Sequence, residues 1–112
     1  SIYSTLSELC GLPIPAHVEG PSFVSLLKNP NATWDRPAIT THGRLNNAVR
    51  DERFRYIRYA DGSEELYDHN VDPLEWKNLA HDSRFAADKK RLAQWLPKKN
   101  APNAKFDAGR KR

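Results

Sequence analysis

The chain has 112 residues, enough for one small domain, and 38% of them are hydrophobic while 29% are charged. No apolar run approaches the roughly 20 residues needed to cross a bilayer, and no basic, apolar and small-residue pattern marks a signal peptide. The single cysteine excludes an internal disulfide and a cysteine-based zinc site.

The formal net charge of +4 is concentrated near one end of the chain. Residues 1–96 carry 12 Lys and Arg against 13 Asp and Glu, whereas residues 97–112 carry six basic residues and one acidic residue. The body of the chain therefore lacks the basic surface that is typical of a nucleic-acid-binding domain, and the charge argues against nucleic acid as a partner.

Two short apolar helices are predicted in the first 30 residues. The first covers residues 1–11, where Gly11 suits the left-handed position after the helix and Pro13 prevents continuation. The second covers residues 22–27. Because such short helices find few partners in this chain, residues 1–30 are expected to be the end of a larger domain and to expose a sticky apolar surface. The apolar positions are Ile2, Leu6, Leu9, Phe23, Leu26 and Leu27.

From Trp34 onward the apolar residues follow the period of two that is typical of β-strands. In the clearest strand, Phe54 and Tyr56 share one face while Arg55 and Ile57 share the other. A hairpin turn is expected at residues 60–63, since Asp-Gly tolerates positive φ. The predicted strands cover residues 38–41, 46–50, 53–59 and 64–68.

A final helix is predicted over residues 83–96, capped by Asp82 or Ser83 and stopped by Pro97. Its apolar stripe consists of Phe85, Leu92 and Leu96. Residues 98–112 are predicted to be a basic, disordered tail. The fold class is therefore α+β: a small antiparallel sheet of about four strands, packed by a C-terminal helix and preceded by two short helices.

Few residue patterns indicate chemistry. Cys10 has no nearby His and is interpreted as a small buried residue at a helix end. The four histidines show no i, i+4 pairing, which argues against a metal site within this chain. The alternating basic and aromatic residues of 53–59 admit two interpretations, a strand that stacks nucleic-acid bases or arginines that lie over aromatic faces.

The polar segment 40–47 lies between two predicted strands. Its side chains suit an anionic or sugar-like ligand, since arginine holds a sulfate or carboxylate through two parallel hydrogen bonds. The alternative is a solvated loop without a ligand. The candidate ligand-binding residues of this segment include Thr41, His42, Arg44, Asn46 and Asn47.

Several segments resemble, in order and spacing, the closing part of sulfatases. One of them, Glu-Leu-Tyr-Asp at residues 65–68, is followed by Asp-Pro-Leu-Glu and then by Asn-Leu-Ala. The resemblance covers about residues 2–97 and is nearest to the iduronate-2-sulfatase-like branch. The matching segments are 2–13, 19–27, 48–50, 54–57, 65–68, 72–75 and 78–80.

The resemblance implies a two-part enzyme of alkaline-phosphatase-like fold that hydrolyses sulfuric esters. The N-terminal part would hold calcium and a formylglycine made from Cys or Ser in a C/S-x-P-S-R motif. Cys10, followed by Gly-Leu-Pro-Ile, does not match this motif. No catalytic residue, metal or cofactor is therefore expected in this chain, which is expected to be a C-terminal fragment that hydrolyses no sulfate ester by itself.

The resemblance also implies that residues 31–97 form a C-terminal subdomain. It would pack on the catalytic domain of the same protein and form part of the pocket wall for a sulfated carbohydrate or aryl substrate. The segment 41–47 would contact that substrate, although Asn47 stands where relatives often have His. Enzymes of this family are commonly exported to the periplasm or secreted, and no membrane partner is expected. The alternative is a small stand-alone module that binds nucleic acid through residues 53–59 and the basic tail.

Overall fold

The computed structural model describes residues 1–105, and the chain divides into two compact units, Ser1–Asp35 and the part from Arg36 onward. The predicted tail at 98–112 falls partly within this range. Residues 98–105 form neither helix nor strand, and residues 106–112 lie outside the described residues. No helix within residues 1–105 is long and apolar enough to cross a membrane.

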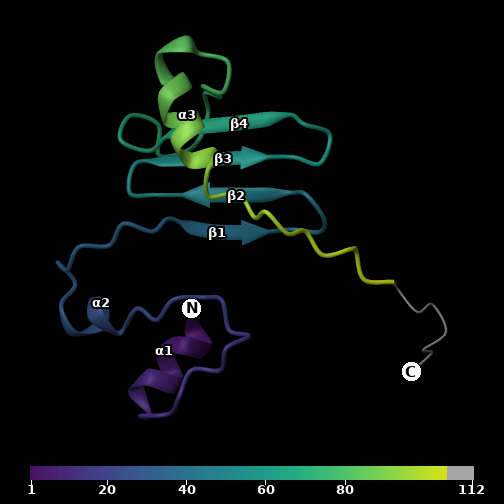
Figure 1. Cartoon of the computed structure of the whole chain (residues 1–112). Helices are drawn as coiled ribbons and strands as arrows, with labels where there is room; N and C mark the ends of the chain where they lie inside the picture. The colour runs from purple at the N-terminus through teal and green to yellow at the C-terminus, as the bar shows by residue number, and fades with distance from the viewer. Residues whose placement is uncertain (106–112) are drawn as a thin grey trace, which may run out of the picture. The chain divides into compact units, whose positions relative to one another are not determined.

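The first unit contains helix α1 (Ile2–Leu9), which ends as the sequence predicts (Figure 1). Gly11 adopts a φ of 67°, and its N–H donates to the carbonyl oxygen of Glu8 at 3.1 Å. The N–H of Leu12 donates to the carbonyl oxygen of Ser7 at 2.8 Å. These two bonds form a Schellman motif, which satisfies carbonyls at the helix end and favours glycine in the left-handed position.

The buried side of α1 is polar rather than apolar. Ser4 and Thr5 are buried, and the Ser4 hydroxyl donates to the Gly20 carbonyl oxygen at 2.6 Å. The Thr5 hydroxyl accepts a hydrogen bond from the N–H of Phe23 at 3.1 Å. The apolar stripe that the sequence predicts is exposed, as is the free thiol of Cys10, so the interpretation of Cys10 as buried is wrong.

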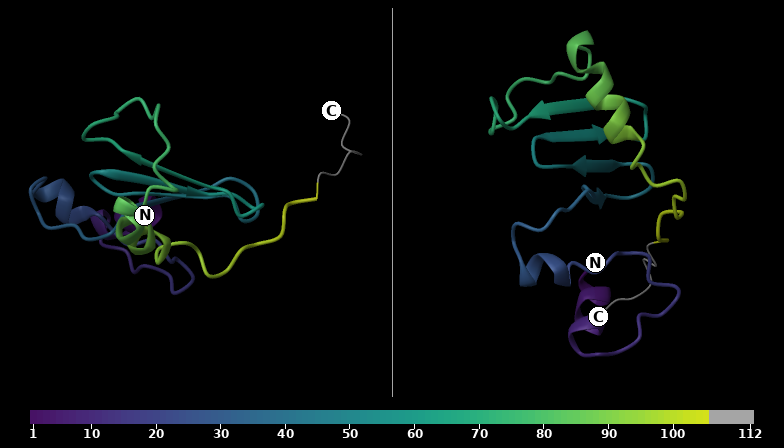
Figure 2. Two further views of the ribbon diagram at one scale, coloured as in Figure 1. Left: turned by 90° about the horizontal axis from the view of Figure 1, so that it is seen from above. Right: turned by 60° about the vertical axis from the view of Figure 1, so that its left-hand side comes forward.

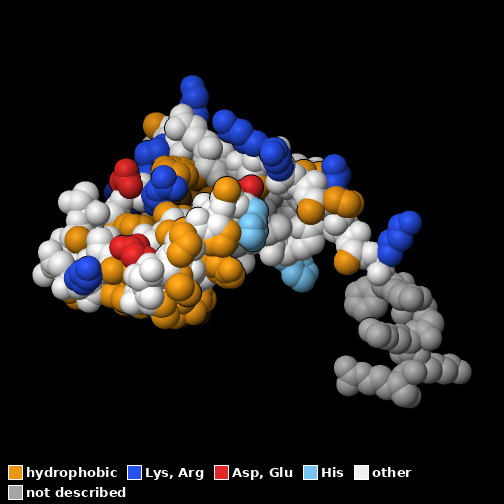
Figure 3. All heavy atoms as spheres, turned by 60° about the horizontal axis from the view of Figure 1, so that its bottom comes forward, with side chains coloured by type: hydrophobic (Ala, Val, Ile, Leu, Met, Phe, Trp, Pro, Cys, Tyr) orange, Lys and Arg blue, Asp and Glu red, His pale blue; other side chains and the backbone are white. Residues whose placement is uncertain are grey.

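Helix α2 (Val24–Lys28) begins two residues later than predicted, and Val24 is its buried residue. Leu27 is exposed, while Phe23 and Leu26 are half-buried. Figure 3 shows apolar side chains crowded on the surface where α1 and α2 are turned toward the viewer. This exposed apolar surface agrees with the expectation that residues 1–30 lack partners within the chain.

The second unit is built on a four-stranded antiparallel sheet in the order β1-β2-β3-β4 (Figure 1). Each strand pairs with its chain neighbour through a hairpin, and β1 and β4 have the bounds predicted. The second and third strands are one and two residues shorter than expected. The strands are β1 (Ala38–Thr41), β2 (Asn47–Arg50), β3 (Phe54–Arg58) and β4 (Glu64–Asp68).

The two faces of the sheet differ, as the alternation of residues 54–58 predicts. Phe54 and Tyr56 point to the buried face, whereas Arg55 and Ile57 are half-buried on the opposite face. The fold class predicted from the sequence is thereby confirmed. The core cluster consists of Val49, Phe54, Tyr56, Leu66, Leu79, Ala80 and Leu92.

The free edge of β4 is covered by the segment that follows it. The Leu79 N–H donates to the Leu66 carbonyl oxygen at 2.7 Å, and the Asn78 side chain accepts from the Leu66 N–H at 3.0 Å. The same amide donates to the carbonyl oxygen of Glu64 at 3.2 Å. Because these groups satisfy the edge of β4, they prevent it from pairing with another strand.

The core is closed by a short 3-10 turn, η1 (Ser83–Phe85), and helix α3 (Ala86–Ala93), which crosses one face of the sheet (Figure 2). The Asp82 side chain accepts from the Arg84 N–H at 3.0 Å, so Asp82 is the cap. The helix ends three residues before the predicted position. The Trp95 N–H donates to the Leu92 carbonyl oxygen, an i→i−3 bond that tightens the last turn.

Glu64 joins the sheet to α3 through three partners. Its carboxylate accepts hydrogen bonds from the Tyr56 hydroxyl at 2.6 Å, from Arg58 at 3.1 Å and from the Lys89 ammonium at 2.8 Å. The bond from Lys89 is the largest cause that lowers the pKa of Glu64 to about 2. Burial, followed by the bond to Glu64, raises the pKa of Tyr56 to about 12.

A Glu64→Gln variant should lose stability at neutral pH and converge with the parent at low pH. Since folding lowers the pKa of Glu64, its contribution is complete above the unfolded pKa and is lost as the pH falls from about 4.5 towards 2. With its partial exposure taken into account, we expect about 2 kcal/mol at pH 7. Thermal unfolding of both proteins between pH 7 and pH 2.5 measures this difference. A difference in Tm that stays constant with pH would contradict the expectation.

Candidate functional site

The polar segment predicted between two strands is the β1–β2 loop, which is braced by hydrogen bonds within the chain. The His42 N–H donates to the Asn46 carbonyl oxygen at 2.9 Å, which closes the loop. Gly43 and Leu45 have φ values of 64° and 68°, and the left-handed region is costly for a leucine. Thr41, His42 and Arg44 are exposed on this loop.

Asn46 and Asn47 use their side chains to hold the loop in place. Asn47 is buried, and its side-chain oxygen accepts from the Thr41 hydroxyl at 2.7 Å. The side-chain oxygen of Asn46 accepts from the Ala60 N–H at 3.0 Å, which ties the β1–β2 loop to the β3–β4 turn. Of the five candidate residues, Thr41, His42 and Arg44 are exposed, and the side chains of Thr41, Asn46 and Asn47 form hydrogen bonds within the chain.

The loop borders a cavity with a volume of about 380 Å³. Thr41, Gly43 and Arg44 form one wall, and Pro97 and residues 99–104 form the other. The Asn103 side-chain oxygen accepts from the Arg44 N–H at 2.8 Å and so joins the two walls. No signal of local periodicity in the sequence indicates that residues 99–104 return to this loop.

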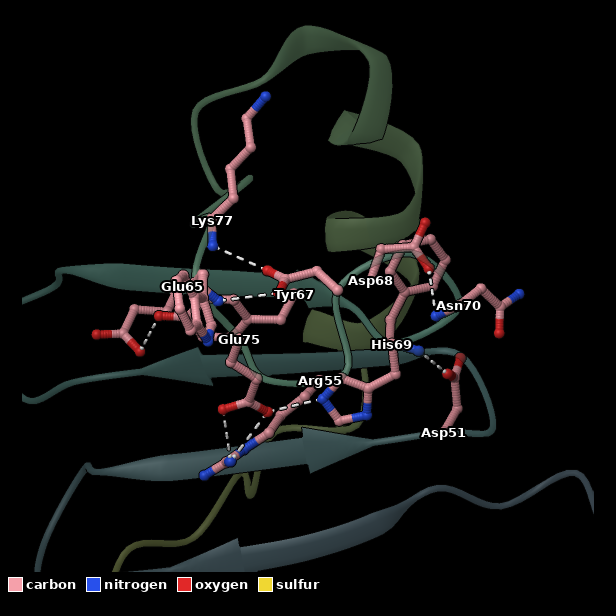
Figure 4. Close-up of polar contacts among 12 residues, drawn as sticks. Asp51, Arg55, Glu65, Tyr67, Asp68, His69, Asn70, Glu75 and Lys77 are labelled. Atoms are coloured by element: carbon pink, nitrogen blue, oxygen red, sulfur yellow. Dashed lines mark hydrogen bonds and ion pairs between the residues drawn. The ribbon is translucent and has the colours of Figure 1, made fainter.

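A second polar cluster lies on the face of the sheet opposite α3 (Figure 4). The Glu75 carboxylate accepts two hydrogen bonds from Arg55, at 2.9 and 3.1 Å, and lies 2.7 Å from Nε2 of His69. Glu75 has a φ of 60°, so these bonds hold a backbone that is unfavourable for a glutamate. On the same face, Glu65 accepts hydrogen bonds from the hydroxyl groups of Tyr59 and Tyr67.

We interpret this second cluster as structural, because its charged groups are paired with one another. Desolvation by burial opposes ionisation of Glu75, but its bonds to His69 and Arg55 outweigh it and lower the pKa. Burial, together with Glu65, raises the pKa of Tyr67 to about 12. The groups satisfy one another. Local patterns in the sequence do not indicate this cluster, because its members lie up to 20 positions apart in the chain.

The arginines of β3 likewise form ion pairs within the second unit. Arg55 binds Glu75, and Arg58 binds Glu64 at 3.1 Å while its guanidinium lies 5.7 Å from the ring centre of Tyr56. Of the two interpretations left open for this strand, the structure matches arginines that lie over aromatic faces. Within residues 1–105, no three His, Cys, Asp or Glu side chains gather so as to fit a metal ion.

The fold is that of a small α+β domain whose β1–β2 loop presents exposed polar residues. A family profile described as N-sulphoglucosamine sulphohydrolase, C-terminal, matches residues 2–101. The chain belongs to this sulfatase family and is a sulfatase C-terminal domain, which confirms the resemblance seen in the sequence.

Two relatives illustrate the similarity in sequence. A sulfatase of Formosa agariphila is 45% identical over 101 residues, which cover 90% of this chain and 20% of the relative. A Delta 4,5-hexuronate-2-O-sulfatase of Bacteroides thetaiotaomicron is 35% identical over 94 residues, which cover 73% of this chain and 19% of the relative. The chain thus spans about a fifth of the length of these relatives.

Solved structures show the same fold. A putative sulfatase from Bacteroides thetaiotaomicron matches with a TM-score of 0.64 and 28% identity, over 80% of this chain and 22% of that one. A 2-O GAG sulfatase matches with a TM-score of 0.63 and 28% identity, over the same shares of each chain. The alternative of a nucleic-acid-binding module finds no support among these comparisons.

Proposed function

We propose that the chain forms the C-terminal subdomain of a larger sulfuric ester hydrolase and that its β1–β2 loop is part of the substrate-pocket wall. In this proposal residues 31–97 are the subdomain, residues 1–30 belong to the larger catalytic domain, and residues 98–112 are the basic tail. Calcium and formylglycine belong to the catalytic domain, which this subdomain packs against. The exposed apolar surface of α1 and α2 supports a partner on that side of the first unit.

The proposed role of the loop rests on the exposed and unpaired guanidinium of Arg44. Its backbone N–H is held by Asn103, while its guanidinium is exposed and has no ion-pair partner among residues 1–105. Five other arginines of the second unit each form an ion pair within the chain, so an unpaired guanidinium on a braced loop is suited to a ligand.

The residues of the loop divide into two roles under this proposal. Thr41, His42 and Arg44 contact the sugar part of a sulfated carbohydrate, and Asn46 and Asn47 keep the loop in place. Two relatives support this substrate class by name, a hexuronate-2-O-sulfatase and a 2-O GAG sulfatase. The loop selects the leaving group and takes no part in breaking the sulfate ester.

Arg44→Ala tests this role in the complete sulfatase that carries the domain. For a 2-O-sulfated hexuronate oligosaccharide, we expect KM to rise about ten- to a hundredfold, because a charge-assisted contact contributes about 1.5–3 kcal/mol. Hydrolysis of a small aryl sulfate should stay nearly unchanged, since the contact lies away from the cleaved bond. Steady-state kinetics with both substrates measures the ratio.

Two variants serve as controls for this experiment. Arg44→Lys should restore only part of the affinity, because an ammonium group lacks the two parallel donors of a guanidinium. Arg50→Ala removes an exposed arginine from the other end of β2 and should leave both substrates unaffected. Equal losses on both substrates with Arg44→Ala, together with a lower Tm, would reject the role of the loop in the pocket.

A further inference from the structure

The cavity beside the β1–β2 loop has a second wall that comes from the segment after α3. Residues 99–104 reach the loop, where Asn103 accepts the Arg44 N–H at 2.8 Å. A Cβ at Gly43 would lie 3.5 Å from the same Asn103 oxygen, so the loop and the second wall are close together at Gly43 as well. Residues 97–100 are steadied by the Asn100 amide, which donates to the Pro97 carbonyl oxygen at 3.2 Å.

The charged residues that line this cavity are both basic. Arg44 lines the cavity from the loop and Lys99 from the opposite wall, and no acidic residue lines it. Within residues 1–105, neither cation has an ion-pair partner, whereas Lys89 and Arg91 are both paired. Two like charges that face one cavity repel each other, and a bound anion would relieve this repulsion.

The remaining lining suits a sugar ring. Pro97, Ala101, Pro102 and Ala104 are apolar lining residues, while Thr41, whose hydroxyl donates to Asn47, is a polar one. The volume of about 380 Å³ lies near the lower end of the range of about 300–1,000 Å³ that is typical of small-molecule sites. A single saccharide unit with one charged substituent is a ligand of this size and chemistry.

We propose that Arg44 and Lys99 together bind one anionic substituent of a saccharide, a carboxylate or a sulfate, and that residues 99–104 are part of the site. This inference rests on the proposed function and deepens it, because it names the charged group that the pocket wall recognises. Lys99 is a binding residue in this proposal, and Asn103 is a positioning residue that acts through the Arg44 backbone.

Lys98 provides a matched control for Lys99. The two lysines are adjacent and both are exposed, but only Lys99 lines the cavity. We propose to titrate the 112-residue chain with glucuronate, with glucose 6-sulfate and with neutral glucose, and to follow the backbone amide resonances by NMR. The first two probes separate a carboxylate from a sulfate as the group recognised.

We expect resonances of residues 41–44 and 99–103 to shift with one of the two anionic sugars and not with glucose. Lys99→Ala should weaken that binding about three- to tenfold, and Lys98→Ala less than twofold. Lys99→Arg should keep the affinity within about twofold of the parent. Added salt should weaken binding of the anionic sugar by all three variants. Unchanged spectra outside the cavity show that each variant keeps its fold.

Three outcomes would overturn the inference. The first is an equal loss with Lys98→Ala and Lys99→Ala, which indicates attraction by the charge of the tail alone. The second is an absence of shifts at residues 99–103. The third is a loss of affinity with Arg44→Ala but none with Lys99→Ala. This outcome would exclude Lys99 from the binding site, and the proposed function would then be tested separately by the kinetics of Arg44→Ala.

Discussion

Leu92→Ala is expected to lower the free energy of unfolding by about 2–5 kcal/mol. Leu92 is fully buried and is the residue of α3 that enters the core of the second unit beside Val49 and Leu66. Truncation removes apolar contacts and leaves a cavity. It also weakens the attachment of α3, which with eight residues is too short to persist without tertiary contacts.

Leu74→Ala is the matched control, since Leu74 is 73% exposed and the chemical change is the same. We expect this variant to stay within about 0.5 kcal/mol of the parent. Urea unfolding followed by tryptophan fluorescence measures both, because Trp95 packs against the core cluster. Similar losses for Leu92→Ala and Leu74→Ala would show that α3 does not close this core.

Asp68→Ala is expected to cost about 2–3 kcal/mol of stability. Asp68 is buried at the end of β4, where its two oxygens accept from Nε of Arg53 at 3.0 Å and from Nη2 at 2.6 Å. It also accepts from the Asn70 N–H at 3.1 Å (Figure 4). The bond from Arg53 is the largest cause that lowers the pKa of Asp68, so Asp68 is ionised in the folded domain at neutral pH.

Two further variants separate the buried pair from surface charge. Asp68→Asn keeps the shape of the side chain and part of its hydrogen bonding. Its free energy of unfolding should therefore lie between those of the parent and Asp68→Ala. Asp88→Ala breaks a contact with Arg91 at 3.8 Å on the surface of α3 and should cost less than about 0.5 kcal/mol. Chemical unfolding at pH 7 compares all of them, and a larger loss for Asp88→Ala than for Asp68→Ala would refute this account.

The elements that depend on local pattern were predictable from the sequence. Alternating side chains predicted the bounds of β1 and β4 and which residues of β3 share a face, because the pleat sends successive residues to opposite faces. Gly11 predicted the end of α1 for the same kind of local reason, since glycine tolerates positive φ. The exposed loop with Arg44 could also be located, because polar residues and Gly43 interrupt two strands.

Predictions that depended on which partner covers a helix were less successful. The spacing of apolar residues in α1 predicted its apolar stripe but not that Ser4 and Thr5 would be its buried side. The hydrogen bond that Ser4 donates to Gly20 and the one that Thr5 accepts from Phe23 decide that side. The helical periodicity of residues 83–96 likewise extended beyond Ala93, where i→i−3 bonds end the regular helix.

The sequence by itself determined the strands, the turns and the family of this protein, because periodicity, turn residues and ordered motifs are all local properties of the chain. Only the tertiary structure decided which polar side chains meet. Arg44 and Asn103 are 59 positions apart, and Arg55 and Glu75 are 20 apart. Contacts at such separations depend on the path of the chain around the sheet. For this reason Lys99, which composition assigned to a tail, lines the same cavity as Arg44.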